Sequence, residues 1–177
     1  KTGVVDWFLW ASLRDCINEI DSSSARSLHM QWPPRSENPD AIQVAMEATS
    51  RGTLCVTAIA VNGLESIQGV LSGDATAWHM AREMVSAGLD FAASIGCGFV
   101  YLPLFGCNMP RTDRELEMAA NQLVHALEYS EKLGILIGTE NILTVAQNNW
   151  LAAELGNHRL RYLLDIYNIQ TVECDVL

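Results

Sequence analysis

The sequence predicts an α/β fold in which short buried strands alternate with amphipathic helices. Six apolar runs of strand length recur along the 177 residues, and stretches with helical spacing of apolar residues separate them. Most of the runs are nearly continuous in apolar residues, which is typical of a parallel sheet covered on both faces. Hydrophobic residues make up 49% and charged residues 18% of the chain, enough for one large core. No linker divides the chain, so residues 1–177 are predicted to form a single domain.

The predicted strands are bounded mainly by glycine and proline. The fifth strand follows Gly134 and ends with Glu140, and the sixth follows Gly156 and carries Asp165. Pro103, near the end of the fourth strand, is acceptable because ladder pairing finishes there. The first four strands are predicted over residues 2–10, 26–32, 54–61 and 99–104.

A short helix marked by Leu13, Ile17 and Ile20 is predicted after the first strand, and four longer helices are predicted from apolar spacing and end signals. One starts at Asn38-Pro39 and closes at Gly52, and another runs from Asp74 to Ile95. Thr112 and Glu115 form a capping box for a helix that ends at Gly134, and the last helix spans residues 144–155. The predicted buried stripes are Ile42, Ala45, Met46 and Thr49 in the first longer helix, Met80, Met84, Ala87, Phe91 and Ile95 in the second, and Leu116, Ala119, Ala120, Leu123, Leu127 and Ser130 in the third.

Two parallel architectures fit this order, an open doubly wound sheet and a TIM (β/α)8-type barrel. The sequence lacks the glycine-rich phosphate loops that would support a nucleotide-binding open sheet. Polar residues at strand ends favour the barrel, since barrel enzymes assemble their sites at that rim: they are His29, Gln31, Asn62, Glu140, Asp165 and Asn168. About six of the eight βα units are predicted in this chain, with units seven and eight missing. We expect the chain alone to be inactive, and either aggregated or completed by another chain.

Charge and composition exclude several classes of partner. The net charge is −10, from 11 Lys and Arg against 21 Asp and Glu, and no basic stripe suits a nucleic acid or a membrane surface. No apolar run reaches the roughly 18 to 20 residues that cross a bilayer. Five cysteines without a C-x-x-C pair indicate reduced thiols in a cytoplasmic protein.

Glu140 and Asp165 are the leading candidates for chemistry. Carboxylates are hard oxygen ligands for a divalent ion such as Mg²⁺ or Mn²⁺. Neighbouring parallel strands lie about 4.8 Å apart, so carboxylates at adjacent strand ends can reach one ion. Two ligands do not complete a site, and the alternative is that each acid caps a helix or pairs with an arginine at the rim. His29 and Asn62 could contact a substrate, although a structural role at the rim is the favoured interpretation of His29.

Residues 81–170 resemble the xylose isomerase-like barrel superfamily of sugar and sugar-phosphate isomerases and epimerases. The resemblance rests on a helix ending in Ile95-Gly96-Cys97, the run Phe99-Val100-Tyr101-Leu102-Pro103-Leu104-Phe105-Gly106, and the motifs around Glu140-Asn141 and Asp165-Ile166-Tyr167-Asn168. It implies that Glu140 and Asp165 supply two of four ligands to Mn, Mg, Co or Zn. A His and a Glu from strands seven and eight would supply the others. It also implies that Glu140 is an acid/base catalyst.

The resemblance further implies that Asn168 contacts substrate. Many relatives have His there, and Asn can bind a hydroxyl but cannot titrate near neutral pH. The leading hypothesis is a metal-dependent isomerase or epimerase that transfers a proton through an enediolate on a small sugar, sugar acid or polyol. A dehydratase of the same superfamily and a degenerate ligand-binding barrel remain alternatives, and a homo-oligomer is compatible with each. A three-metal nuclease of the superfamily would need a basic face and more than four histidines.

Overall fold

The computed structural model describes residues 3–5, 14–15, 17, 27–34, 40–156 and 158–163, the first three by their backbone only. Within them, six strands form one parallel sheet in the sequential order β1-β2-β3-β4-β5-β6. The strands are β1 (Gly3–Val5), β2 (Ser27–Gln31), β3 (Cys55–Ala60), β4 (Phe99–Leu104), β5 (Leu136–Asn141) and β6 (Leu160–Leu163). A parallel sheet with strands in chain order is the arrangement of a (β/α)8 barrel, so the predicted fold class is confirmed.

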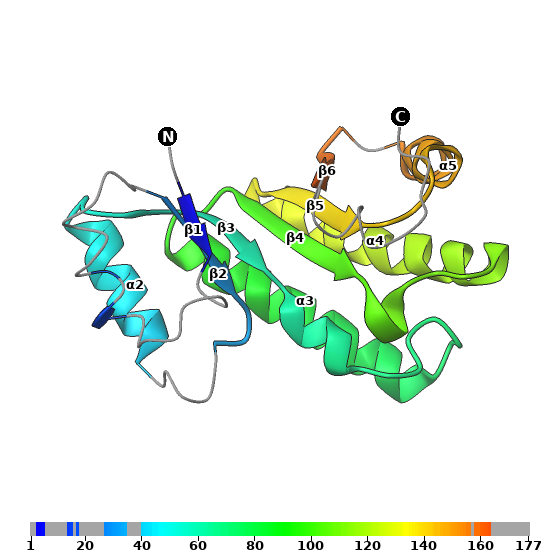
Figure 1. The fold of residues 1–177 in the computed structure, drawn as a ribbon, viewed down its shortest axis with the longest axis horizontal. Coiled ribbons are helices and arrows are strands. Elements are labelled where there is room, and N and C mark those ends of the chain that lie inside the picture. Colours follow the sequence, from blue (N-terminus) through cyan, green and yellow to red (C-terminus); the bar gives the residue numbers. More distant parts are fainter. Residues whose placement is uncertain are drawn as a thin grey trace.

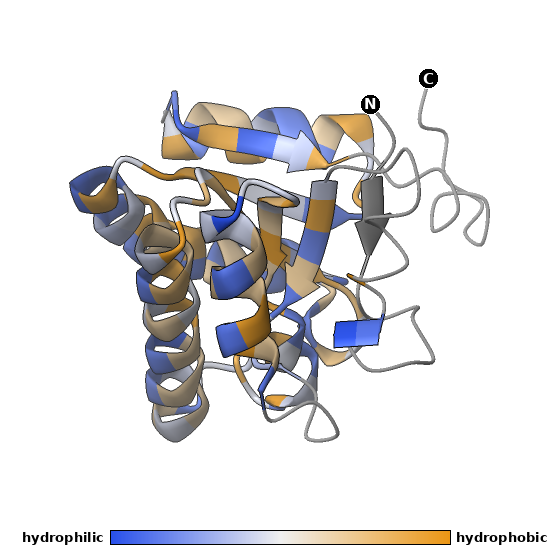
Figure 2. Ribbon diagram, turned by 90° about the vertical axis from the view of Figure 1, so that its left-hand side faces the viewer, coloured by the Kyte–Doolittle hydropathy of each residue, from blue (hydrophilic) through white to orange (hydrophobic). Residues whose placement is uncertain are grey.

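Helices connect the strands, and α3 and α4 lie side by side along one face of the sheet (Figure 1). The longer elements are α2 (Ala41–Ser50), α3 (Ala75–Ser94), α4 (Asp113–Leu133) and α5 (Val145–Leu155), and the short 3₁₀ turns η2 (Asn62–Ser66) and η3 (Gly106–Asn108) follow β3 and β4. Helices carry hydrophilic and hydrophobic stretches in alternation, as elements with one buried face do (Figure 2). In the described part of the chain, no helix combines the length and apolarity needed to traverse a membrane.

Local sequence signals place the ends of α4 and α5 correctly, whereas α2 begins at Ala41, with Asp40 at its N-cap position, and not at the predicted Asn38-Pro39. Thr112 accepts a hydrogen bond from the Glu115 amide, and the Glu115 carboxylate accepts one from the Thr112 amide, so the predicted capping box is present. Thr144 and Gln147 form a second box at the start of α5. Gly134 ends α4 with φ of 73°, a left-handed conformation that glycine adopts without strain.

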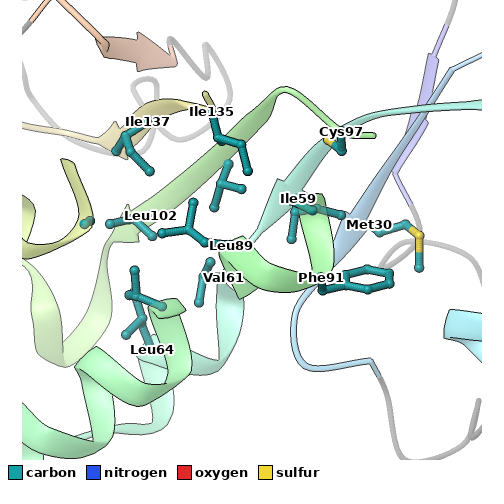
Figure 3. Packing of buried hydrophobic residues seen from close by; sticks show 14 of the residues in the cluster. Met30, Ile59, Val61, Leu64, Leu89, Phe91, Cys97, Leu102, Ile135 and Ile137 are labelled. Carbon is teal, nitrogen blue, oxygen red and sulfur yellow. The ribbon is translucent and has the colours of Figure 1, made fainter. Parts of the chain in front are cut away.

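The main core fills the space between the sheet and the helices. Leu89 of α3 points toward Val61 and Leu102 at the ends of β3 and β4, and Ile137 of β5 joins the same cluster (Figure 3). The predicted stripe of α4 is confirmed, since all six of its residues are buried.

The predicted stripes of α2 and α3 are wrong in part. Met46 is 45% exposed and Met80 is 49% exposed, and Ala87 also faces solvent. The buried positions of α3 are mostly small, namely Ala77, Ala81, Val85, Gly88, Leu89, Phe91 and Ala92. A Cβ added at Gly88 would lie 3.2 Å from both Trp32 Cδ1 and Val61 Cγ2, so the helix approaches the sheet too closely for larger side chains. Cys55 and Thr57 of β3 are exposed as well, so the first half of that strand is open on one face.

Candidate functional site at the carboxyl ends of the strands

Glu140 lies on the face of the sheet opposite the main core. Successive residues of a strand point to opposite faces, so Gly138 and Glu140 share one face while Ile137 and Thr139 share the other. Ile137 belongs to the main core, and a Cβ on Gly138 would meet the Phe99 ring at 2.5 Å. Glu140 is half-buried and is the second-last residue of β5, next to the carboxyl-terminal edge of the sheet.

The strand register shows what surrounds Glu140 on this face. Pro103 of β4 and Leu163 of β6 are its partners on either side. One level deeper lie Ala60, Tyr101 and Gly138, also in register. Ala58, Ala60 and Tyr101 form a second, smaller apolar cluster with Phe99 and Leu163, which gives this face a mainly apolar floor beneath the carboxylate.

Asn62 and Glu140 lie at the same edge of the sheet. Asn62 follows β3 after one residue and opens the turn η2, and the Val61 amide still donates to Tyr101 O over 3.0 Å. Asn62 is half-buried. β4 lies between β3 and β5 in the sheet. Asn62, after β3, and Glu140, near the end of β5, are therefore one strand apart along this edge.

His29 lies deeper than the sequence suggests. It is the third of the five residues of β2, and it pairs with Ala58, one level below Ala60 and Tyr101. Its ring meets the Tyr101 ring edge-on, with 6.1 Å between centroids. Burial lowers the pKa of His29, which keeps the imidazole neutral near pH 7 and able both to donate and to accept a hydrogen bond.

A hydrogen-bond network holds the segment that carries Glu140, and sequence reasoning did not identify it. Asn141 donates to Thr139 Oγ1 over 3.0 Å and to Asn148 Oδ1 over 3.1 Å, and its own Oδ1 accepts from the Leu143 amide over 3.0 Å. Asn148 also donates to Leu143 O over 3.1 Å. These bonds lie on the helix side of β5 and fix the turn into α5. One signal for this network was present in the sequence, namely that Asn141 directly follows the candidate carboxylate Glu140.

The rim loops after β3 and β4 are bonded to each other. Asn108 Nδ2 donates to Leu64 O over 2.5 Å, and Cys107 Sγ donates to Glu65 O over 3.1 Å. Both interactions connect η3 to η2 across more than 40 positions of sequence, so no local pattern predicts them. They order the part of the rim that contains Asn62.

Of the sequence-predicted metal ligands, Glu140 lies among the described residues. In this part of the chain, no three His, Cys, Asp or Glu side chains come together to hold an ion. Glu140 has the oxygen ligands that a hard divalent cation prefers. Its carboxylate is half-buried, near the carboxyl-terminal end of β5. Asp165 and Asn168, the other sequence-predicted residues of the site, lie outside the described residues.

Comparisons with known proteins agree on the fold. No protein-family model matches the sequence, and no curated protein sequence matches it. Solved structures match over nearly the whole chain, as in a xylose isomerase-like TIM barrel/4-hydroxyphenylpyruvate dioxygenase fusion protein, with a TM-score of 0.77 and 12% identity over 98% of this chain and 28% of that one. D-psicose 3-epimerase with D-tagatose from Clostridium cellulolyticum gives 0.76 and 12% over 99% of this chain and 66% of that one.

A third structure, an AP endonuclease of family 2 from Brucella melitensis, gives a TM-score of 0.74 and 12% identity over 98% of this chain and 72% of that one. This chain spans about two thirds of the length of the epimerase structures that it matches. At this identity the likeness shows the fold. The chain has the fold of the xylose isomerase-like TIM barrels, with six strands of such a barrel among its described residues.

Proposed function

We propose that this protein is a metal-dependent isomerase or epimerase of the xylose isomerase-like superfamily, acting on a small sugar, sugar acid or polyol. The observation that carries the proposal is the position of Glu140 on the face of β5 opposite the helices, next to the carboxyl-terminal edge of the sheet. Enzymes with this architecture build their sites at that edge. The solved structures of similar fold support the choice of reaction, because several are sugar epimerases or isomerases by name.

Asp165 is proposed as the second metal ligand. Leu163 pairs with Glu140 across β5 and β6, and Asp165 follows Leu163 by two positions, the spacing of residues that share one face of a strand. A His and a Glu from two further strands complete the proposed ligand set. The bound ion would polarise the substrate carbonyl and stabilise negative charge on its oxygen.

Glu140 carries the proton step in this proposal. Its carboxylate takes a proton from the carbon beside the substrate carbonyl or returns one to it, and the overall reaction conserves the atoms of the substrate. The apolar floor beneath Glu140, formed by Tyr101 and its neighbours, excludes water from that side. Asn62, Asn168 and the neutral His29 are proposed to bind substrate hydroxyls, for which uncharged donors and acceptors suffice.

The proposed substrate is a sugar-like small molecule, and the proposed location is the cytoplasm. Nucleic acid is not proposed as a partner. The structural likeness to an AP endonuclease concerns the fold, and a net charge of −10 opposes binding to a phosphate backbone. The dehydratase alternative shares the metal and Glu140 but loses water from the substrate. NMR analysis of products separates the two, since only the isomerase conserves the mass of its substrate.

The test uses the whole protein. Mn²⁺ at about 100 times its Kd stabilises a protein by roughly 2.7 kcal/mol, so the melting temperature should rise on adding Mn²⁺. Glu140→Gln keeps the size of the side chain and removes its charge, and should abolish both this rise and turnover while preserving the fold. Glu154→Gln, the same change at an exposed position of α5, should behave as the wild type. Absence of bound metal in the wild type, with no rise in melting temperature, would refute the proposal.

A further inference from the structure

A small cavity lies behind the rim, between the end of β4 and the helices α3 and α4. The volume that the centre of a water molecule can reach inside it is about 40 Å³. Most of its wall is apolar, formed by side chains such as Val85, Leu102 and Leu123. Three polar residues also line it, Asn108, Gln122 and His125.

Two amide groups in this wall have buried polar atoms without a partner. Asn108 is 5% exposed, and its Nδ2 donates to Leu64 O, which leaves Oδ1 on the other side of the amide. Asn108 Oδ1 and Gln122 Nε2 are both buried, and neither has a hydrogen-bond partner among the residues that the structure describes. Leaving such an atom unsatisfied costs about 1–3 kcal/mol, so each needs a partner that the described side chains do not supply.

We propose that this cavity is a binding site for ordered water that links Asn108 Oδ1 to Gln122. One water occupies roughly 10–15 Å³, so a cavity of about 40 Å³ has room for at least one. One water donates to Asn108 Oδ1 and accepts from Gln122 Nε2. Water also suits the opposite orientation of the Gln122 amide, because its two O–H groups can donate to two oxygens at once.

The location gives the water a structural role. Gln122 belongs to α4, whereas Asn108 belongs to η3, which is bonded to η2 at the rim. A bridging water therefore connects the outer helix to the loop that orders Asn62. This inference does not rest on the proposed metal chemistry, since Glu140, the proposed ligand among the described residues, does not line the cavity.

A crystal structure at a resolution that shows ordered water, combined with ¹⁷O magnetic relaxation dispersion to count long-lived waters, tests the proposal. In the wild type we expect density within hydrogen-bond distance of Asn108 Oδ1 and of the Gln122 amide. Gln122→Met removes the amide at similar side-chain length and should lose at least one long-lived water. Gln43→Met makes the same change at an exposed position of α2, where Gln43 donates to Glu47, and should lose none.

The wild-type measurement decides the matter even where Gln122→Met does not fold. A cavity that is dry in the wild type would overturn the proposal. So would a structure in which both amide atoms are bonded to protein groups, or a Gln122→Met variant that keeps every long-lived water.

Discussion

Asn141 donates a hydrogen bond of 3.1 Å from Nδ2 to Oδ1 of Asn148, and this bond ties the end of β5 to helix α5. Glu140, the preceding residue, faces the other side of the sheet. The strand therefore presents a candidate reactive carboxylate on one face and is anchored by an amide on the other. The position of Glu140 therefore depends on side chains that lie on the opposite face of the sheet.

Asn141→Ala should destabilise the protein by about 3 kcal/mol. The change removes three hydrogen bonds and leaves the Leu143 amide without its acceptor, and each bond contributes roughly 1 kcal/mol. Urea unfolding followed by circular dichroism measures the loss as a lower midpoint at unchanged slope. Asn149→Ala, an exposed position of α5, is the matched control and should change stability by less than about 0.5 kcal/mol. Equal effects of the two variants would show that the network contributes nothing.

Gly138→Ala should destabilise the sheet beneath Glu140 by about 1–3 kcal/mol, the usual cost of overpacking. The new Cβ would lie 2.5 Å from Phe99 Cζ and 3.1 Å from Tyr101 Cβ, so the Phe99 ring must move. The same method applies, with Gly98→Ala as control because no atom lies within 4 Å of a Cβ at that position. Combining Gly138→Ala with Phe99→Leu should cost less than the sum of the two single changes. If the stability losses of the two single changes simply add, the strain in Gly138→Ala does not come from contact with the Phe99 ring.

Stability should decrease as the pH falls through the ordinary histidine pKa of 6.5. Burial lowers the pKa of His29, so the unfolded chain binds the proton more tightly and the free energy of unfolding falls until the pH drops below the folded pKa. Burial and the nearby Arg82 lower the pKa of His125 in the same direction. Urea midpoints at about pH 7.5 and pH 5.5 measure the effect. His29→Gln should reduce the difference between them, and a further His125→Gln change should reduce it more. An unchanged difference in the double variant would contradict this assignment.

The sequence predicted well whatever depends on neighbours along the chain. The capping box of Thr112 and Glu115 starts α4, and Gly134 ends it. Both signals involve contacts within a few residues, so the sequence predicted both ends of the helix. The alternation of strands and helices, and hence the parallel sheet, followed from runs of apolar residues. Glu140 was identifiable because a carboxylate ends such a run, and the structure places it at the rim.

The stripe of α3 shows where the sequence was insufficient. Met80, Met84, Ala87, Phe91 and Ile95 have helical spacing, and so do the small residues that are buried. Periodicity alone does not choose between two stripes of one apolar helix. The choice came from the short distance between α3 and the sheet at Gly88, which only tertiary packing sets.

By itself, then, the sequence determined the α/β class and the acidic residue at the end of β5, because these follow from local periodicity and end signals. The tertiary structure decided which face each strand residue occupies, that His29 packs beneath the rim against Tyr101, and that Asn141 and Asn148 hold β5. It also brought Asn108 to Leu64, 44 positions away in sequence, and so formed the cavity that joins α4 to the rim. Such contacts depend on how distant segments pack, and no local pattern in the chain encodes them.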